Sequence, residues 1–228
     1  MKEKNRNVIN EAFRVVRTNL EFMAGKEGSR VIMLTSCNPG SGKTFISANL
    51  ALSLAIKGKK VLAIDLDLRK ASLSGYVDSP KKGIADYLSG HADSLESIVV
   101  KGSLHEHLDV IPVGTIPPNP TELLFEAGLE KALEELKKKY DYIFIDCPPV
   151  EIVADASIIG KMADYTLFIV RAGLLDKSML PVIEKYYTDK KYNGLSLLLN
   201  GTENYAGKYG YHRHGYGYGY GNYGGYLD

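Results

Sequence analysis

The feature that most constrains the fold of this chain is the glycine-rich segment CNPGSGKT at residues 37–44. It follows a run, RVIMLTS, that reads as a buried strand, and it precedes an apolar stretch with the pattern of a helix. Gly40 and Gly42 allow backbone N–H groups to close around phosphate oxygens, and Lys43 reaches the terminal phosphates. The segment therefore predicts a phosphate-binding loop, although Cys37 stands where the usual pattern has its first glycine.

The contacts expected of this loop extend into the first turn of the helix. We expect the loop residues that line the nucleotide to be Pro39, Gly40, Ser41, Gly42, Lys43, Thr44 and Phe45. The hydroxyl of Thr44 would reach a Mg²⁺ ion bound with the phosphates. The alternative is a Gly/Ser turn with a chance lysine, and the order strand, loop, helix counts against it.

Composition describes one globular domain without a strongly charged partner. The 228 residues are 45% hydrophobic and carry a formal net charge of +1, which provides enough apolar sequence for a core. Lysines and arginines are spread along the chain, which disfavours nucleic acid as the main ligand. Cys37 and Cys147 are expected to be buried thiols in a reducing cytosol. No apolar run approaches about 18 residues and no signal peptide opens the chain, so the chain is expected to be soluble.

Strand-like runs recur along the chain, with helical patterns between most of them. The runs lie at 30–36, 60–65, 108–113, 141–146, 164–170 and 194–200. Several are continuously apolar, as a parallel sheet covered on both faces requires. We expect an α/β fold with a doubly wound, mostly parallel sheet of the P-loop NTPase type, in which ligands bind outside the carboxyl ends of the strands.

Two of these strands deliver carboxylates to that edge. Asp146 follows one strand, in the place where a Walker B aspartate holds Mg²⁺ through its water shell. Asp65 and Asp67 follow another and, two residues apart in an extended segment, would face the same way beside the metal and the γ-phosphate. One of them could accept a proton from an incoming hydroxyl. Turn formation at a strand end is the alternative for this pair.

The three motifs resemble the Walker A, A′ and B motifs of bacterial tyrosine kinases. The residues that carry the resemblance are Lys43 with Thr44, the segment from Asp65 through Asp67 to Arg69, and Asp146 after Ile-Phe-Ile. Lesser segments agree: EAFRVVRTNL at 11–20 resembles the family's N-terminal Glu-x-x-Arg-x-x-Arg helix, and GTIPPNPTELL at 114–124 resembles its middle loop. The match spans roughly residues 8–204 and then the tail.

The resemblance implies an ATP- and Mg²⁺-dependent protein-tyrosine kinase. The implied catalytic residues are Lys43, Asp65, Asp67 and Asp146, and the implied metal ligands are Thr44, Asp65 and Asp146. Because a tyrosine hydroxyl has a pKa near 10, it needs a proton acceptor as it attacks. We predict that Asp67 is this acceptor. Asn200 occupies the place where this P-loop branch reads the adenine edge, and a turn asparagine is the alternative.

A change of composition divides the chain into a kinase domain at 1–204 and a flexible tail at 205–228. The tail is rich in tyrosine and glycine and nearly lacks aliphatic residues. In the family, such tyrosines are phosphorylated by a neighbouring subunit. The expected phosphoacceptors are Tyr205, Tyr209, Tyr211, Tyr216, Tyr218, Tyr220, Tyr223 and Tyr226. The alternative is a low-complexity segment that self-associates by stacking.

A helix at about 8–25 is predicted to pack on the domain through one face. That face is expected to hold Ile9, Ala12, Phe13, Val16, Leu20 and Met23. The opposite face would present Glu11, Arg14 and Arg17, either as a solvated surface or, as the resemblance implies, as the contact to the next subunit of a ring of eight.

The resemblance also implies partners and a location. These are a transmembrane polysaccharide co-polymerase or activator, in the same chain or separate, a cognate tyrosine phosphatase, other protein substrates, and a cytoplasmic place at the inner face of the membrane. The role would be in capsular or extracellular polysaccharide synthesis and export. Whether the chain is a whole protein or the cytosolic end of a longer one stays open.

Two other functions remain alternatives. A MinD- or ParA-like ATPase would switch partners without phosphorylating protein, but that branch has a lysine five residues before the loop lysine, where this chain has Asn38. The C-terminus also lacks the basic amphipathic helix by which such switches bind membranes. A non-catalytic scaffold with a sticky tail is disfavoured by the intact loop and acidic motifs.

Overall fold

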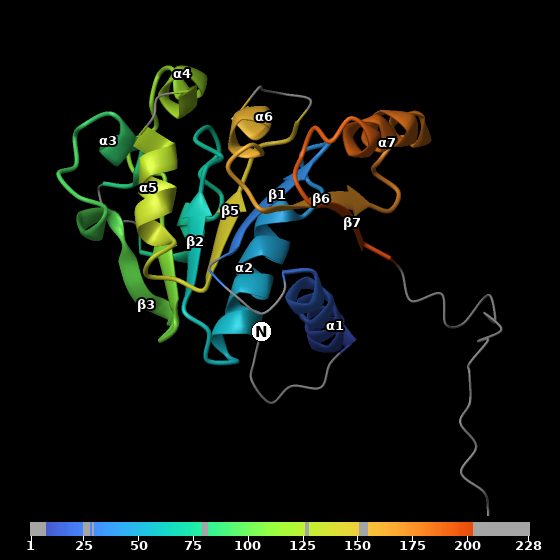
Figure 1. Ribbon diagram of the computed structural model, residues 1–228, viewed down its shortest axis with the longest axis horizontal. Coiled ribbons are helices and arrows are strands. Elements are labelled where there is room, and N and C mark those ends of the chain that lie inside the picture. The colour runs from blue at the N-terminus through green and yellow to red at the C-terminus, as the bar shows by residue number, and fades with distance from the viewer. Residues whose placement is uncertain are drawn as a thin grey trace, which may run out of the picture.

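The structure, a computed structural model, describes residues 8–24, 28, 30–78, 82–125, 128–150 and 155–202. In these ranges one seven-stranded sheet is covered by helices on both faces (Figure 1). The predicted tail at 205–228, with all of its tyrosines, lies outside the described residues. No helix in the described ranges is long and apolar enough to cross a bilayer.

The strands and helices alternate along most of the chain. The strands are β1 (Arg30–Ser36), β2 (Val61–Asp65), β3 (Val100–His105), β4 (Leu108–Ile111), β5 (Tyr142–Asp146), β6 (Tyr165–Arg171) and β7 (Leu195–Asn200). The helices are α1 (Val8–Ala24), α2 (Lys43–Ala55), α3 (Ile84–Leu88), α4 (Pro120–Phe125), α5 (Gly128–Leu136), α6 (Asp155–Ile159) and α7 (Leu180–Thr188).

The sheet order is β3-β4-β2-β5-β1-β6-β7, and all pairs are parallel except β3 with β4. The predicted fold class is therefore confirmed, and each predicted strand is present within a few residues of its expected bounds. The order places β1 between β5 and β6, so the loop after β1 and the acids after β2 and β5 emerge along one edge of the sheet. This is the edge at which parallel α/β sheets bind ligands.

Strand β3 was not expected. It forms an edge strand antiparallel to β4, with His105 opposite Leu108 across a tight hairpin. Its middle residues, from Lys101 to Ser103, are exposed. An exposed edge strand needs no continuous apolar run, which is why the apolar pattern did not reveal it.

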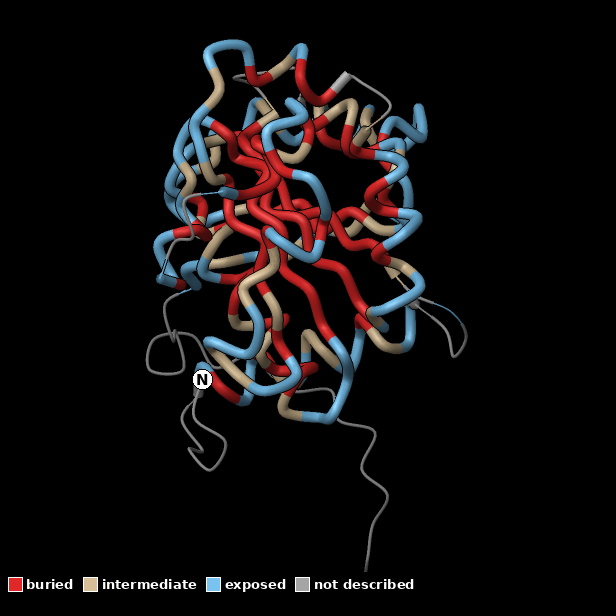
Figure 2. Tube along the Cα trace, turned by 90° about the vertical axis from the view of Figure 1, so that its left-hand side faces the viewer, coloured by how far each residue is buried: buried red, intermediate tan, exposed pale blue. Residues whose placement is uncertain are grey.

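Side chains from alternating strand positions fill a core on each face of the sheet, and the buried chain runs through the middle of the molecule (Figure 2). On one face, α1 and α2 pack on strand residues such as Leu34 and Phe144. On the other face, α3 to α6 pack on residues such as Met33 and Ile145, and α7 contacts Phe168. This alternation fixes the register of each strand and therefore the positions of its terminal polar residues.

The docking face of α1 differs from the predicted one. Phe13 and Leu20 are buried as expected, but Ile9 is 55% and Met23 is 40% exposed. Asn10 is buried instead. Residues 10, 13, 17 and 20 are spaced three and four apart, so they form one helical stripe, and this stripe faces α2.

The expectation that Arg17 faces outward is therefore wrong. Its guanidinium donates to the carbonyl oxygen of Ser53 on α2 at 2.9 Å and to the hydroxyl at 3.2 Å. Glu11 and Arg14 do lie on the solvent side and pair with each other at 2.8 Å. One of the three residues predicted at a subunit interface thus has an internal role in fixing α1 to the domain.

Candidate nucleotide-binding and catalytic site

The glycine-rich loop connects β1 to α2 in a conformation that requires glycine. Gly40 has φ 77° and Gly42 has φ 94°, both in the left-handed region. A Cβ atom at Gly42 would also collide with the side-chain amide of Asn200. The backbone at Gly42 is the N-cap of α2, so the loop places free N–H groups and the positive end of the helix at the same point.

This loop forms one wall of a cleft of about 350 Å³ at the carboxyl edge of the sheet. Six of the predicted nucleotide contacts line it, namely Pro39, Gly40, Gly42, Lys43, Thr44 and Phe45. Ser41 is buried instead, and its hydroxyl donates to the carbonyl oxygen of Asn38 at 2.8 Å, so it stabilises the loop from behind. The amide of Asn200 donates to the carbonyl oxygen of Ser41 at 2.8 Å. The end of β7 is thereby fixed to the loop, and the adenine contact of Asn200 stays a prediction.

Lys43 is a buried cation at the centre of the acidic edge. Only 8% of the residue is exposed. Burial lowers its pKa, while Asp146 and Asp67 act in the opposite direction by favouring the charged form. A lysine charge in such a partly dry place interacts more strongly with phosphate oxygens than a solvated lysine does.

Asp146 at the end of β5 lies beside Thr44 at the start of α2. The Thr44 hydroxyl donates to Asp146 Oδ2 at 2.6 Å. Burial raises the pKa of Asp146 to about 7, and Asp65 adds to this effect while the Thr44 hydrogen bond and Lys43 oppose it. The other oxygen, Oδ1, is buried and has no hydrogen-bond partner among the described residues. An unpaired buried carboxylate oxygen next to a threonine hydroxyl suits a hydrated cation that arrives with the phosphates.

No group of three His, Cys, Asp or Glu side chains in the described ranges could hold a metal ion alone. Mg²⁺ in nucleotide sites commonly takes only one or two protein ligands, with waters and phosphate oxygens for the rest. Thr44 and Asp146 provide such a partial set. The residues present therefore fit a Mg²⁺ ion bound together with a nucleotide.

Asp65 is fully buried, and both of its oxygens accept hydrogen bonds from the protein. Oδ2 accepts from the N–H and the hydroxyl of Ser74, each at 2.8 Å, and Oδ1 accepts from the N–H of Asp67 at 3.2 Å. Burial raises its pKa to about 6 against these hydrogen bonds. Neither Asp65 nor Asp146 is among the residues that line the cleft, but Asp146 keeps one oxygen without a partner in the described ranges, whereas both oxygens of Asp65 are occupied. The contacts of Asp65 favour a positioning role for the segment after β2 over direct contact with a metal.

Asp67 is the acid of this pair that lines the cleft. It is 7% exposed, and its Oδ1 accepts from the backbone N–H of Lys70 at 3.2 Å. That contact orients the carboxylate, because it ties the side chain to the turn that follows β2. Asp67 is the predicted proton acceptor, and it is the one of the two acids whose side chain lines the cleft.

Several site residues were not predicted. Lys70, Ser72 and Tyr76 also line the cleft, and Ser74 holds Asp65 while its hydroxyl accepts from the N–H of Val113 at 2.9 Å. These residues follow Asp67 closely in the sequence but form no motif. The polar residues Arg69, Lys70, Ser72 and Ser74, which follow the strand-end carboxylates, were the available signal.

Arg171 also reaches the phosphate-binding loop. It is the last residue of β6, and its guanidinium donates to the carbonyl oxygen of Gly40 at 2.6 Å. Arg69 instead points toward α4, where it donates to the hydroxyl of Thr121 at 3.3 Å. Arg171 therefore contacts the loop, whereas Arg69 connects the segment after β2 to α4.

The comparisons with known proteins agree with this site. A family model described as an AAA domain matches residues 29–183. Tyrosine-protein kinase CpsD of Streptococcus agalactiae serotype III is 38% identical over 202 residues, which cover 88% of this chain and 85% of the relative. The kinase domain of the Escherichia coli tyrosine kinase ETK has a TM-score of 0.80 at 32% identity, covering 95% of this chain and 82% of that one.

A second structural match connects the fold to nucleotide-dependent ATPases. The septum site-determining protein MinD from Pyrococcus horikoshii, complexed with Mg-ADP, has a TM-score of 0.60 at 30% identity. The matched region covers 75% of this chain and 68% of the MinD chain. The likeness to the tyrosine kinases is both higher and more extensive. The chain belongs to the bacterial tyrosine-protein kinases, on the P-loop branch that also contains MinD.

Proposed function

We propose that this chain transfers the γ-phosphoryl group of ATP to tyrosines of its own C-terminal tail, on a neighbouring copy within a ring. The observation that carries the proposal is the cleft, which Lys43, Thr44 and Asp67 line next to a phosphate-binding loop, with Asp146 hydrogen-bonded to Thr44 just behind the lining. A cation, a metal-binding pair and a proton acceptor are the parts that phosphoryl transfer to a hydroxyl requires.

Each residue of the site has a separate role in the proposed phosphoryl transfer. Lys43 and the loop N–H groups hold the β- and γ-phosphates, and Thr44 with Asp146 would hold Mg²⁺, which neutralises phosphate charge when bound. The tyrosine oxygen attacks the γ-phosphorus, a new P–O bond forms, and the bond from the γ-phosphorus to the bridging oxygen of ADP breaks. Asp67 accepts the tyrosine proton.

The end of the described chain supports the tail as substrate. Asn200 is bound to the loop through Ser41, so the chain leaves the domain beside the nucleotide cleft. Tyr205 follows a few residues later. A segment that begins at this exit can reach a nearby active site, and a ring would bring each tail to the adjacent cleft.

The solvent face of α1 supports a subunit contact. Val15 is 55% and Phe22 is 81% exposed, and with Glu11 and Thr18 they form one outward stripe. Exposed large apolar residues beside charged ones are typical of interfaces. We propose that this stripe, with Arg14, contacts the next subunit; the ring size of eight rests on the resemblance alone.

The remaining biological roles are proposals that rest on the resemblance. They comprise work at the inner face of the membrane with a transmembrane activator, reversal by a cognate tyrosine phosphatase, and regulation of capsular or extracellular polysaccharide export. The homologous kinases make them reasonable to test together, by asking whether loss of Lys43 in cells abolishes surface polysaccharide.

The test is mass spectrometry of the chain after incubation with Mg²⁺-ATP. We expect phosphate at several positions between Tyr205 and Tyr226, and none in a Lys43→Met variant incubated alone. The transfer between copies is tested by mixing that variant with an active chain whose tail tyrosines are replaced by phenylalanine. Phosphate on the Lys43→Met chain supports transfer between subunits, whereas ATP consumption with an unmodified tail would favour the MinD-like switch.

A further inference from the structure

A second polar cleft lies at the opposite edge of the sheet from the nucleotide. It has a volume of about 470 Å³ and is formed where β1, β2 and β5 begin. The cations that line it are Arg30, Lys59, Lys60, Lys137, Lys138 and Lys139. Asp141 is the one acid among the described residues of the lining. The cleft is therefore a concave, strongly positive site that the proposed kinase reaction does not use.

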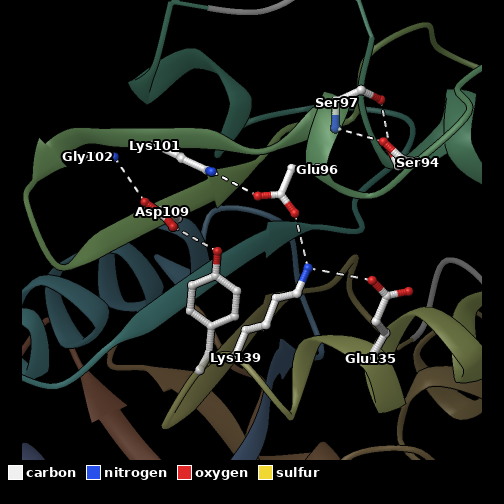
Figure 3. A network of polar contacts seen from close by, with 9 residues as sticks. Ser94, Glu96, Ser97, Lys101, Gly102, Asp109, Glu135 and Lys139 are labelled. Atoms are coloured by element: carbon white, nitrogen blue, oxygen red, sulfur yellow. Dashed lines mark hydrogen bonds and ion pairs between the residues drawn. The ribbon is translucent and has the colours of Figure 1, made fainter.

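Some of these cations are already neutralised by neighbouring acids. Lys139 pairs with both Glu96 and Glu135 (Figure 3), and the N–O distances are 3.1 Å and 3.6 Å. Lys137 pairs with Glu134 at 3.1 Å. Glu96 is shared with Lys101 at 2.9 Å. The carboxylate of Asp141 accepts from the backbone N–H of Lys60 at 2.8 Å and is thus turned toward the main chain.

The remaining lysines have no such partner. Lys59, Lys60 and Lys138 are exposed, and within the described ranges no side-chain ion pair or hydrogen bond involves any of their ammonium groups. They come from two different segments, the turn after α2 and the end of α5, yet face one cleft. Clustered like charges without compensation repel each other, so an anion placed between them would be stabilised.

We propose that this basic cleft binds phosphotyrosines of the chain's own C-terminal tail after they have been formed. The proposal rests on the proposed function, which would create several phosphates on a short segment, each carrying about −1.5 to −2 charges. Lysine ammonium groups and an arginine are the usual ligands of such phosphates. The concave shape suits separate phosphate groups on a peptide better than a flat membrane surface.

The tail can reach the cleft. Residues 203–228 continue from the end of β7, and 26 residues can span up to about 90 Å when extended. The radius of gyration expected of a domain of this size is about 17 Å. The phosphorylated tail, repelled by the acids around Lys43, would thus be held at the far edge of the sheet, which leaves the nucleotide cleft open for the next turnover.

The lysines could instead serve only the fold. Lys59 and Lys60 follow the end of α2, and Lys138 follows the end of α5, where cations stabilise the helix dipole. That role predicts a loss of stability on charge removal but no affinity for phosphate. The experiment must therefore measure binding and stability separately.

The test uses the full chain with Lys43→Met, so that its own tail carries no phosphate, and a fluorescent synthetic peptide of residues 213–228. The peptide carries phosphate on Tyr216, Tyr218 and Tyr220, or none. We expect the phosphorylated peptide to bind by fluorescence anisotropy and the unphosphorylated one to bind at least about tenfold more weakly, with affinity falling as salt rises. Because the phosphates are synthetic, the result does not depend on whether the chain is an active kinase.

Charge reversal locates the site. Lys59→Glu, Lys60→Glu and Lys138→Glu together should weaken phosphopeptide binding at least about tenfold. The matched control reverses three exposed lysines outside the cleft, Lys131, Lys177 and Lys185, with the same change of net charge, and should alter binding less than about twofold. If the triple glutamate variant unfolds, replacement of the same three lysines by glutamine gives the readout, with melting temperatures measured for every variant.

Three results would overturn the proposal. They are equal binding of both peptides, equal losses in the cleft and control variants, and melting changes without a binding change. Vesicles with anionic lipids form a separate arm: if the cleft variant loses vesicle binding while the phosphopeptide never binds, the cleft is a membrane site and the proposal is wrong.

Discussion

The two edges of the sheet show opposite ways of using charge. At the carboxyl edge, Lys43, Asp65, Asp67 and Asp146 are each less than 10% exposed and interact through hydrogen bonds and close charges. At the amino edge of the same strands, Lys59, Lys60 and Lys138 are exposed around an open cleft. Buried charges interact strongly and respond to single substitutions, whereas exposed charges are screened and act as a group.

The largest effect is expected for Asp67→Asn. This change removes the carboxylate that faces the cleft while conserving its size, so the rate of tail phosphorylation should fall at least about 100-fold, a typical contribution of general base catalysis. The rate is measured as phosphate transferred to the Lys43→Met chain by a tail-substituted kinase. Thermal stability should change little, because Asp67 makes one backbone contact through its side chain.

A comparison with Asp65→Asn sharpens this result. Asp65 accepts three hydrogen bonds in the interior, so its amide variant should lose stability together with activity. A fully active Asp67→Asn chain would sink the assignment of the proton acceptor.

Next in size is the effect of Ser74→Ala on stability. The Ser74 hydroxyl donates to Asp65 and accepts from the N–H of Val113, all inside the protein. Its loss leaves two buried polar groups less satisfied and should cost about 1–3 kcal/mol of unfolding free energy. Denaturant unfolding measures this, with Ser97→Ala as a control because the Ser97 hydroxyl is exposed. Equal losses of unfolding free energy in the two variants would mean that the buried hydrogen bonds of Ser74 contribute no more to stability than exposed ones.

The carboxyl edge should also make stability depend on pH. Without nucleotide and metal, burial raises the pKa of Asp65 to about 6 and of Asp146 to about 7, above the ordinary value of 3.8. The folded state then holds more protons than the unfolded state between these values, so this contribution is present below about pH 4 and is lost as pH rises through about 7.

Asp146→Asn tests that dependence. The variant cannot lose a proton at this site, so in EDTA its stability relative to the unsubstituted chain should increase between pH 5 and pH 8, on the order of 1–3 kcal/mol. Thermal unfolding at both pH values measures the difference. Parallel pH profiles for the two proteins would show that Asp146 is ionised in the free protein.

The sequence predicts those parts of the fold and the site that depend on short, continuous segments of the chain. The loop at 37–44 and the strand-end acids are short segments whose chemistry can be recognised from the sequence alone, and the parallel order of β1, β2 and β5 places them at one edge of the sheet. The apolar strands were equally readable because both faces of the sheet are covered. The role of Ser74 could not be predicted, because it depends on a hydrogen bond to the buried Asp65. The turn that brings the two residues together has no recognisable sequence pattern.

The basic cleft at the amino edge of the sheet could not be predicted from the sequence. The cations that meet there are far apart in sequence, as Arg30, Lys60 and Lys138 show. In the sequence, such positive charges look evenly distributed along the chain. The sheet order brings β1, β2 and β5 together, so the residues that precede them meet at one place. Likewise, apolar residues of α1 such as Val15 and Phe22 lie outside the buried stripe, and only the contact with α2 shows that Arg17 belongs to that stripe.

The smallest effect is expected at the amino edge, from Glu96→Gln. Glu96 pairs with both Lys101 and Lys139 on the surface, and these contacts lower the pKa of its carboxyl group. Because exposed ion pairs contribute little, the melting temperature should not change measurably. Yet the variant removes one of the two acids that pair with Lys139 beside the cleft and leaves only Glu135, so phosphopeptide binding should strengthen by about twofold. A drop in melting temperature without tighter binding would show that the exposed network supports the fold, and the contrast between the two edges would then fail.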